Sequence, residues 1–317
     1  MTRHLGKRSK PKKLKSKFQK NSIQYLLEQG TLHDMREARK INNAHVKYYW
    51  DYYSELATQR NAIQDQIKQA LIQTCIPYAI EKWQRALKYK YSLHPLSIAG
   101  SLTFIGGRFN TGRGVNSEIP TFAGLYLAKN KDTALQEHLG QEPVSDESKL
   151  TPREIALTNP ASETIISISG KLDKIFDLTG LNSLHPFIEL IKNFVLSPEL
   201  KSAAKKLQIQ QPEIIKTSDK LLETLLCTRW RQLPSEYDVP ANSQIFGHLV
   251  YSAGIEGILY PSKLTTQPCL VIFPENFSGT DSYLVLDDET PHPKVPNKVD
   301  GSNWRICELN AKEIIEY

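Results

Sequence analysis

Apolar and polar residues recur with a helical period in the N-terminal part of the chain. Within ELATQRNAIQDQIKQALIQTCI (55–76), apolar residues return every three or four positions with polar residues between them. Such a stripe lets a helix bury one face and leave the other in water. We therefore predict that residues 22–90 are helical. Pro77 and the HPLS stretch at 94–97 interrupt this pattern and place a boundary at about 90–95.

The pattern changes after residue 98. Short runs typical of strands follow one another: SLTFI (101–105), LYLA (125–128), TIISIS (164–169), GILY (257–260) and CLVIF (269–273). Helical stretches separate them at 131–140 and, over a longer span, at 184–231. This order predicts an α+β fold with a mixed sheet core, a helical N-terminal region and a helical insertion at about 184–231.

Basic residues gather at the start of the chain. The net charge is +6, yet nine of the 40 Lys and Arg residues lie in residues 1–20, which contain no acid. The remainder then has 31 basic against 34 acidic residues. We divide the chain into a basic disordered tail (1–21), a helical N-terminal region (22–94) and an α+β domain (95–317). The tail is interpreted as a solvated arm, with binding to nucleic acid or an anionic surface as the alternative.

Composition excludes several classes of protein. No run approaches the ~18 apolar residues of a membrane span, and no apolar segment of a signal peptide follows the basic start. Four cysteines in 317 residues are too few for a disulfide scaffold. Their wide spacing argues against a zinc site and indicates buried thiols. We therefore expect a cytoplasmic protein that contacts no membrane and holds no metal.

An aromatic run precedes the helical stripe. It comprises Tyr48, Tyr49, Trp50, Tyr52 and Tyr53, with Lys47 beside it. Such rings can stack nucleic-acid bases. Packing of one helix side onto a core is the interpretation that we favour, because basic residues do not cluster here.

The densest candidate for chemistry is IGGRFNTGRG (105–114). Its glycines permit close backbone approach to an anion, and Arg108 offers a planar fork for phosphate or carboxylate. A tight turn with a solvated arginine is the alternative. The run is not a P-loop, because Arg113 and Gly114 stand where Lys and Ser or Thr are required. The sequence also lacks G-x-G-x-x-G and G-x-S-x-G, which excludes those nucleotide-binding and serine hydrolase motifs.

Two further polar residues follow predicted elements. Glu137 lies on the helix predicted at 131–140, and Ser262 follows the strand and proline of GILYP. Taken singly, a helical glutamate is usually solvated and a serine after proline is usually a turn residue.

Together these segments resemble the RES-domain family. GGRFN, LYLA, TALQE and GIEGILYPS follow one another in the family's order, with FDLT (176–179) and CLVIF also in place, over about 98–275. The resemblance implies a fold related to ADP-ribosyltransferases and breakdown of NAD+ at its nicotinamide–ribose bond. It also implies a toxin of a toxin–antitoxin pair. The family's polar site residues match Arg108, Tyr126, Glu137 and Ser262.

The resemblance also assigns roles. Glu137 would stabilise the positive charge that builds on the ribose as nicotinamide leaves. Arg108 and the glycine-loop amides, with Gly107 and Asn110, would bind the pyrophosphate. Tyr126 would offer its face to nicotinamide and its phenol as a hydrogen-bond donor, and Ser262 would donate a hydrogen bond to phosphate or amide.

Some features depart from the family or stay open. Family members usually have an arginine in the first strand, whereas LKYKYSLHPLS (87–97) offers only Lys88, Lys90 or His94. The attacking group can be water, inorganic phosphate or a protein side chain. Phosphate would need a second anion site, for which the candidates are Arg113, Lys129 and Lys263. We expect NAD+ as substrate with no cofactor, an antitoxin or regulatory partner, and a homo-oligomer.

Overall fold

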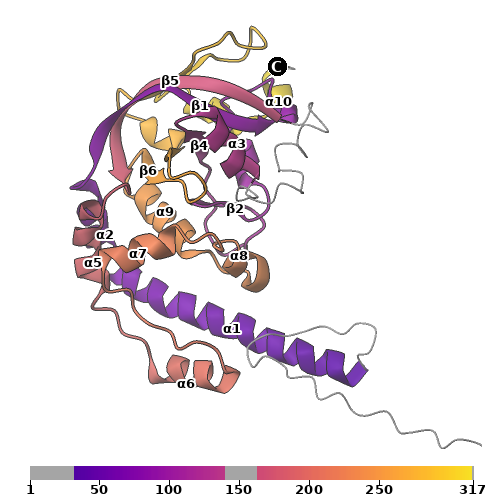
Figure 1. Ribbon diagram of the computed structural model, residues 1–317, viewed down its shortest axis with the longest axis vertical. Coiled ribbons are helices and arrows are strands. Elements are labelled where there is room, and N and C mark those ends of the chain that lie inside the picture. Colours follow the sequence, from indigo (N-terminus) through magenta and orange to yellow (C-terminus); the bar gives the residue numbers. More distant parts are fainter. Residues whose placement is uncertain (1–31, 140–162, 316–317) are drawn as a thin grey trace, which may run out of the picture.

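A computed structural model describes residues 32–139 and 163–315 of the chain (Figure 1). The helices are α1 (Leu32–Ala62), α2 (Gln64–Ile72), α3 (Lys131–Leu139), α5 (His185–Ile191), α6 (Pro198–Leu207), α7 (Ser218–Leu225), α8 (Gln232–Tyr237), α9 (Asn242–Ser252) and α10 (Ala311–Ile315). The strands are β1 (Ile76–Lys88), β2 (Gly106–Gly107), β3 (Asn110–Thr111), β4 (Leu125–Ala128), β5 (Glu163–Asp177), β6 (Gly257–Pro261), β7 (Pro268–Ile272), β8 (Tyr283–Leu286) and β9 (Lys298–Asp300).

Seven strands form one mixed sheet in the order β1-β4-β7-β6-β5-β8-β9. Only the β5–β6 pair is parallel among the strand pairs of the described residues. Strand β1 also pairs with β5, so these two long strands form a bent ribbon that curls the sheet back on itself (Figure 1). Irregularities at Ile76/Tyr78 and Ile80/Trp83 provide the bend, because a bulge increases local twist. The expected mixed sheet core is confirmed.

The helical prediction is correct for residues 32–72 and wrong for 76–88, which form β1. The reason lies in the bulge. Ile80, Trp83 and Leu87 are buried in β1 at a spacing of three and four residues, which imitates a helical stripe. The extra residue at the bulge shifts the alternation of the strand by one, so the two periods cannot be separated in the sequence. The helical N-terminal region therefore ends before β1, although the division of the chain into domains stays a prediction.

The strand predicted at 101–105 is also wrong. Residues Ala99–Leu102 form a short 3₁₀ helix, and Phe104 lies in a turn with a φ of 51° and an exposed fraction of 83%. Three of the other strand predictions fall within β4, β5 and β6, the fourth (269–273) exceeds β7 by one residue, and α3 occupies the helix predicted at 131–140.

The segment predicted as a helical insertion joins two parallel strands. A parallel pair needs a long crossover connection, and the chain between β5 and β6 supplies it with α5 to α9. Within 184–231, three helices alternate with non-helical connections. Helix α1 packs against α6 and α8 of this connection (Figure 1).

The aromatic run of α1 serves this packing. Tyr48 is buried against Leu196, Leu200 and Ala204, and the Tyr49 ring lies 4.2 Å from that of Tyr237 between centroids. The interpretation of the run as core material is confirmed for these two residues.

Two apolar cores lie on opposite faces of the sheet, and alternate residues of one strand reach both. In β7, Val271 belongs to the core beneath α2, α5, α7 and α9, whereas Leu270 and Ile272 belong to the core that contains Trp83 and Phe277. This alternation follows from the period of two in a strand. The sheet is therefore anchored on both sides, which gives the site described below a rigid base.

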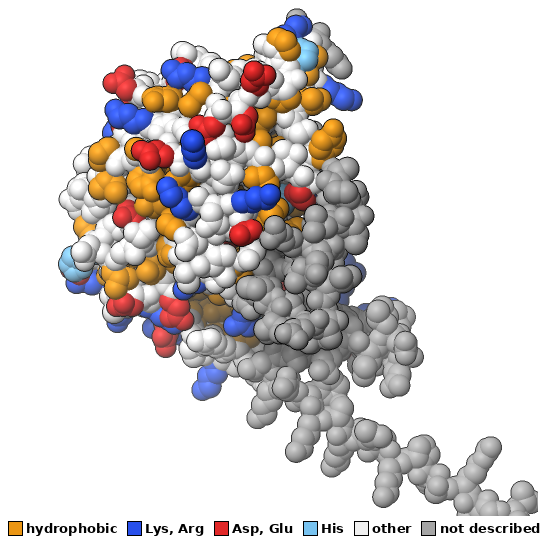
Figure 2. All heavy atoms as spheres, turned by 45° about the horizontal axis from the view of Figure 1, so that its top comes forward, with side chains coloured by type: hydrophobic (Ala, Val, Ile, Leu, Met, Phe, Trp, Pro, Cys, Tyr) orange, Lys and Arg blue, Asp and Glu red, His pale blue; other side chains and the backbone are white. Residues whose placement is uncertain are grey.

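The basic tail at 1–21 and residues 22–31 lie outside the described residues. Acidic and basic side chains are interspersed over the face shown in Figure 2. No described helix is long and apolar enough to cross a membrane. All four cysteines are free, but only Cys269 and Cys307 are buried; Cys227 is exposed, contrary to the prediction of buried thiols.

Candidate active site

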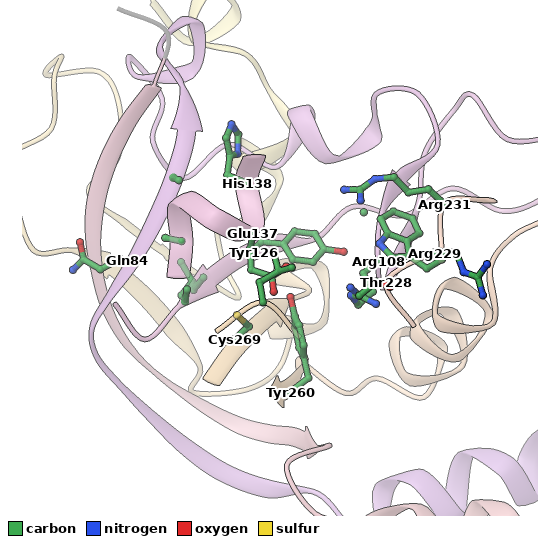
Figure 3. A pocket seen from close by; sticks show the side chains of 17 residues that line it. Gln84, Arg108, Tyr126, Glu137, His138, Thr228, Arg229, Arg231, Tyr260 and Cys269 are labelled. Carbon is green, nitrogen blue, oxygen red and sulfur yellow. The ribbon is translucent and has the colours of Figure 1, made fainter. Parts of the chain in front are cut away.

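A cavity of about 430 Å³ opens between the sheet, α3 and the connection that follows α7. Strands β1, β4, β6 and β7 form its base, and α3 provides one wall. Figure 3 shows Tyr126, Glu137, Tyr260 and Cys269 together at one end, with Arg108 and Arg231 toward the other. The fold thus brings together four of the predicted site residues, Gly107, Arg108, Tyr126 and Glu137.

The glycine-rich segment forms a hairpin that carries Arg108 at its tip. Gly106 and Gly107 pair with Thr111 and Asn110, which leaves Arg108 and Phe109 as the turn. Gly106 has a φ of 87°, a conformation that glycine adopts without steric cost. The Arg108 guanidinium donates to the Cys227 carbonyl oxygen at 2.8 Å. This bond ties the hairpin to the crossover connection.

Asn110 holds the hairpin from beneath and does not line the cavity. The residue is fully buried, and its amide group donates to the carbonyl oxygens of Ser101 and Phe122. Its Oδ1 accepts from the Gly107 amide at 3.0 Å and from the Tyr126 hydroxyl at 2.9 Å. All its hydrogen-bonding groups are therefore used inside the protein. Its predicted contact with a ligand is replaced by a positioning role.

The Tyr126 hydroxyl group is fixed by two hydrogen bonds, one that it donates and one that it accepts. Besides donating to Asn110, the hydroxyl oxygen accepts from the Phe109 amide at 3.0 Å. Burial raises the pKa of Tyr126 above its usual value. The ring, rather than the hydroxyl, is left to face the cavity. Gly107 lines the cavity beside this ring, and a Cβ there would lie 2.6 Å from Asn110 Oδ1.

Ser262 lies behind Glu137. Its hydroxyl donates to Glu137 Oε1 at 2.6 Å and accepts from the amides of Leu264 and Thr265 at 3.1 Å each. The serine is only 2% exposed, whereas the half-buried Glu137 lines the cavity. The single hydroxyl proton is thus committed to the carboxylate. In this arrangement Ser262 orients Glu137 instead of reaching a ligand.

Several residues that line the cavity were not anticipated from the sequence, among them a tyrosine and a cysteine beside Glu137. Tyr260 on β6 and Cys269 on β7 line the same end as Glu137. Both are buried, and desolvation raises the pKa of each, so the phenol and the thiol are neutral at pH 7. Both lie in apolar strand runs whose pattern gives no sign of a functional face.

The basic residues that were predicted to form a second anion site do not line the cavity, and two other arginines do. Arg113, Lys129 and Lys263 are absent from the cavity lining, whereas Arg229 and Arg231 are part of it. They flank Trp230 in the segment between α7 and α8. The sequence signal was the Arg-Trp-Arg triplet within a stretch interpreted as helical.

The first strand does contain an arginine. Because β1 spans 76–88, Arg85 belongs to it and precedes the 87–97 segment in which the first-strand arginine was expected. Its guanidinium points away from the cavity and donates to the carbonyl oxygens of Pro95 and Ser97 at 2.6 and 2.7 Å. The neighbouring Gln84 and Ala86 line the cavity instead.

The other candidates from that segment are placed as follows. His94 is buried, and its Nδ1 contacts the Leu309 carbonyl oxygen at 3.1 Å. Lys88 is exposed at the end of β1 and absent from the cavity lining, and the side chain of Lys90 lies outside the described part of the chain.

The chain was compared with known protein families, curated proteins and solved structures. The RES domain matches residues 82–292, about two thirds of the chain. None of the curated proteins compared with the chain matches it. Among solved structures, the chain is similar to one in the crystal structure of the M. tuberculosis MbcT-MbcA toxin-antitoxin complex. The identity is 15% and the TM-score 0.38, over 80% of this chain and 98% of that one. On the extent of the domain match, the chain belongs to the RES domain family.

Proposed function

We propose that this protein is an NAD+-consuming toxin that cleaves the nicotinamide–ribose bond. Membership of the RES domain family supports the proposal, as does a cavity with a carboxylate at one end and guanidinium groups at the other. NAD+ has the matching distribution of charge, because its cationic nicotinamide riboside is joined to an anionic diphosphate. Residues 98–275, on which the resemblance depends, lie within the matched domain.

The observation that carries the proposal is the hydrogen bond from Ser262 to Glu137 at the cavity wall. It fixes Oε1, which leaves Oε2 available to the ribose. As the bond to nicotinamide lengthens, positive charge develops on the ribose ring, and a fixed carboxylate stabilises that charge. Nicotinamide departs as a neutral base, so its departure requires no general acid.

Aromatic and cationic groups position the rest of the substrate. The Tyr126 ring faces the cavity and offers a flat surface to nicotinamide. Arg108, held by the Cys227 carbonyl, offers its remaining guanidinium protons to the diphosphate. Gly107 brings its backbone to the cavity surface, where a side chain would displace Tyr126 and Asn110.

Product analysis tests this proposal. Purified protein is incubated with NAD+, with and without inorganic phosphate, and the products are identified by mass spectrometry. Nicotinamide and ADP-ribose indicate hydrolysis, a phosphorylated ADP-ribose indicates phosphorolysis, and mass added to a protein indicates ADP-ribosyl transfer. Glu137→Gln should lower turnover by about 100-fold or more, since it removes the charge that the transition state requires. Glu199→Gln on the distant α6 serves as the control.

The toxin role is tested in cells. Expression of the wild-type chain should deplete NAD+ and arrest growth, and Glu137→Gln should relieve both effects. Co-expression of proteins encoded next to this chain tests for an antitoxin, because an antitoxin should restore growth without loss of the toxin. Intact NAD+ during growth arrest would contradict the proposed activity.

A further inference from the structure

Three guanidinium groups line the cationic end of the cavity. Arg108 comes from the β2–β3 hairpin, while Arg229 and Arg231 come from the segment that follows α7. Among residues 32–139 and 163–315, no carboxylate forms an ion pair with any of these three guanidinium groups. Converging like charges in a concave, partly buried site are unfavourable unless an anion joins them.

Trp230 holds two of these guanidinium groups near each other. The side chain is 7% exposed, and Arg231 Cζ lies 4.6 Å from its ring centroid. Arg108 Cζ lies 6.0 Å from the same centroid. Burial lowers the pKa of Arg231 and the charge of Arg108 lowers it further, whereas the Glu137 carboxylate acts in the opposite direction. Within the described residues the Arg231 guanidinium makes no hydrogen bond and lies over the Trp230 ring, while the Arg231 backbone carbonyl oxygen accepts from the Ser235 amide at 3.0 Å.

We propose that Arg231, supported by Trp230, is a second ligand for the diphosphate of the substrate, opposite Arg108. This inference rests on the proposed function and deepens it. A diphosphate carries two negative charges and several acceptor oxygens, which suit two planar guanidinium forks. The crossover connection between β5 and β6 therefore completes the binding site, and the enzyme selects nicotinamide compounds that carry a diphosphate over phosphate-free nucleosides.

Arg108 also joins the β2–β3 hairpin to this segment. Its bond to the Cys227 carbonyl fixes the chain three residues before Trp230. The hairpin and the crossover connection are thereby held at a set separation. Helix α8 begins at Gln232, directly after Arg231, and its Tyr237 packs on α1. The position of Arg231 is thus supported from both sides of the segment.

Binding of ADP to the full chain, measured by isothermal titration calorimetry, tests the inference without turnover. Arg231→Gln should weaken ADP binding by about tenfold or more, the effect of losing one charge-assisted hydrogen bond. Arg231→Lys keeps the charge without the planar fork, so its affinity for ADP should lie between those of wild type and Arg231→Gln. Adenosine, which lacks phosphate, should bind wild type and Arg231→Gln within twofold of each other. Arg305→Gln is the matched control, since Arg305 also lies over a tryptophan, 5.2 Å from the Trp304 ring centroid, outside the cavity.

Three results would overturn the inference: no ADP binding to wild type, equal ADP binding by wild type and Arg231→Gln, or an equal loss of adenosine binding. Thermal unfolding of each variant separates a lost ligand from a lost fold. The outcome is also separable from that of the proposed function. If ADP binding depends on Arg231 but NAD+ stays intact, the anion site stands and the proposed reaction fails.

Discussion

Replacement of Ser262 by alanine removes the group that orients Glu137. The lost bond is a 2.6 Å hydrogen bond to a carboxylate, and such a bond has a net value of about 1.5–3 kcal/mol. If its full effect appears in the transition state, kcat falls by roughly 10- to 100-fold. KM for NAD+ should change little, because Ser262 does not line the cavity.

The same substitution leaves two amide groups without their acceptor. The N–H groups of Leu264 and Thr265 both donate to Ser262 Oγ, so unfolding free energy should drop by about 1–3 kcal/mol. Initial rates at several NAD+ concentrations separate kcat from KM, and urea unfolding gives the stability. Ser262→Thr keeps the hydroxyl and should recover much of kcat despite its extra methyl group. A kcat within twofold of wild type in a folded Ser262→Ala protein would refute the positioning role.

Two further predictions concern stability. Gly107→Ala places a Cβ 2.6 Å from Asn110 Oδ1 and against the Tyr126 hydroxyl, which should destabilise the fold by about 1–3 kcal/mol; urea unfolding beside Gly180→Ala, an open position, checks this. Burial lowers the pKa of His94 to about 4, so its neutral form is favoured in the folded state. The unfolded chain then binds more protons between pH 6.5 and 4, and stability should fall by about 2 kcal/mol from pH 7 to pH 5. His94→Gln should flatten this dependence, and an unchanged slope would contradict the assignment.

The order of short motifs predicted the family, and local pattern predicted most of the elements that carry the site. LYLA and CLVIF form β4 and β7, and the helix with Glu137 begins and ends close to its expected bounds. These predictions are correct because the apolar residues that each element buries in the core are close together in the sequence, so that a short window contains the whole pattern. The first strand failed, since a bulge in β1 gave Ile80, Trp83 and Leu87 the spacing of a helix. The arginine that this strand does contain, Arg85, therefore lies outside the segment in which an arginine was expected.

Sequence alone determined which side chains were available for the chemistry: Arg108 on a glycine hairpin, Tyr126 on a strand, Glu137 on a helix and Ser262 after a proline. Tertiary structure decided what each one touches. The sheet closes through β1 and β5, and the crossover connection returns Trp230 and Arg231 to the hairpin from more than 100 residues away. Ser262 and Asn110 face protein groups, and Tyr260 faces the cavity, because each orientation depends on contacts distant in the chain that no local period records.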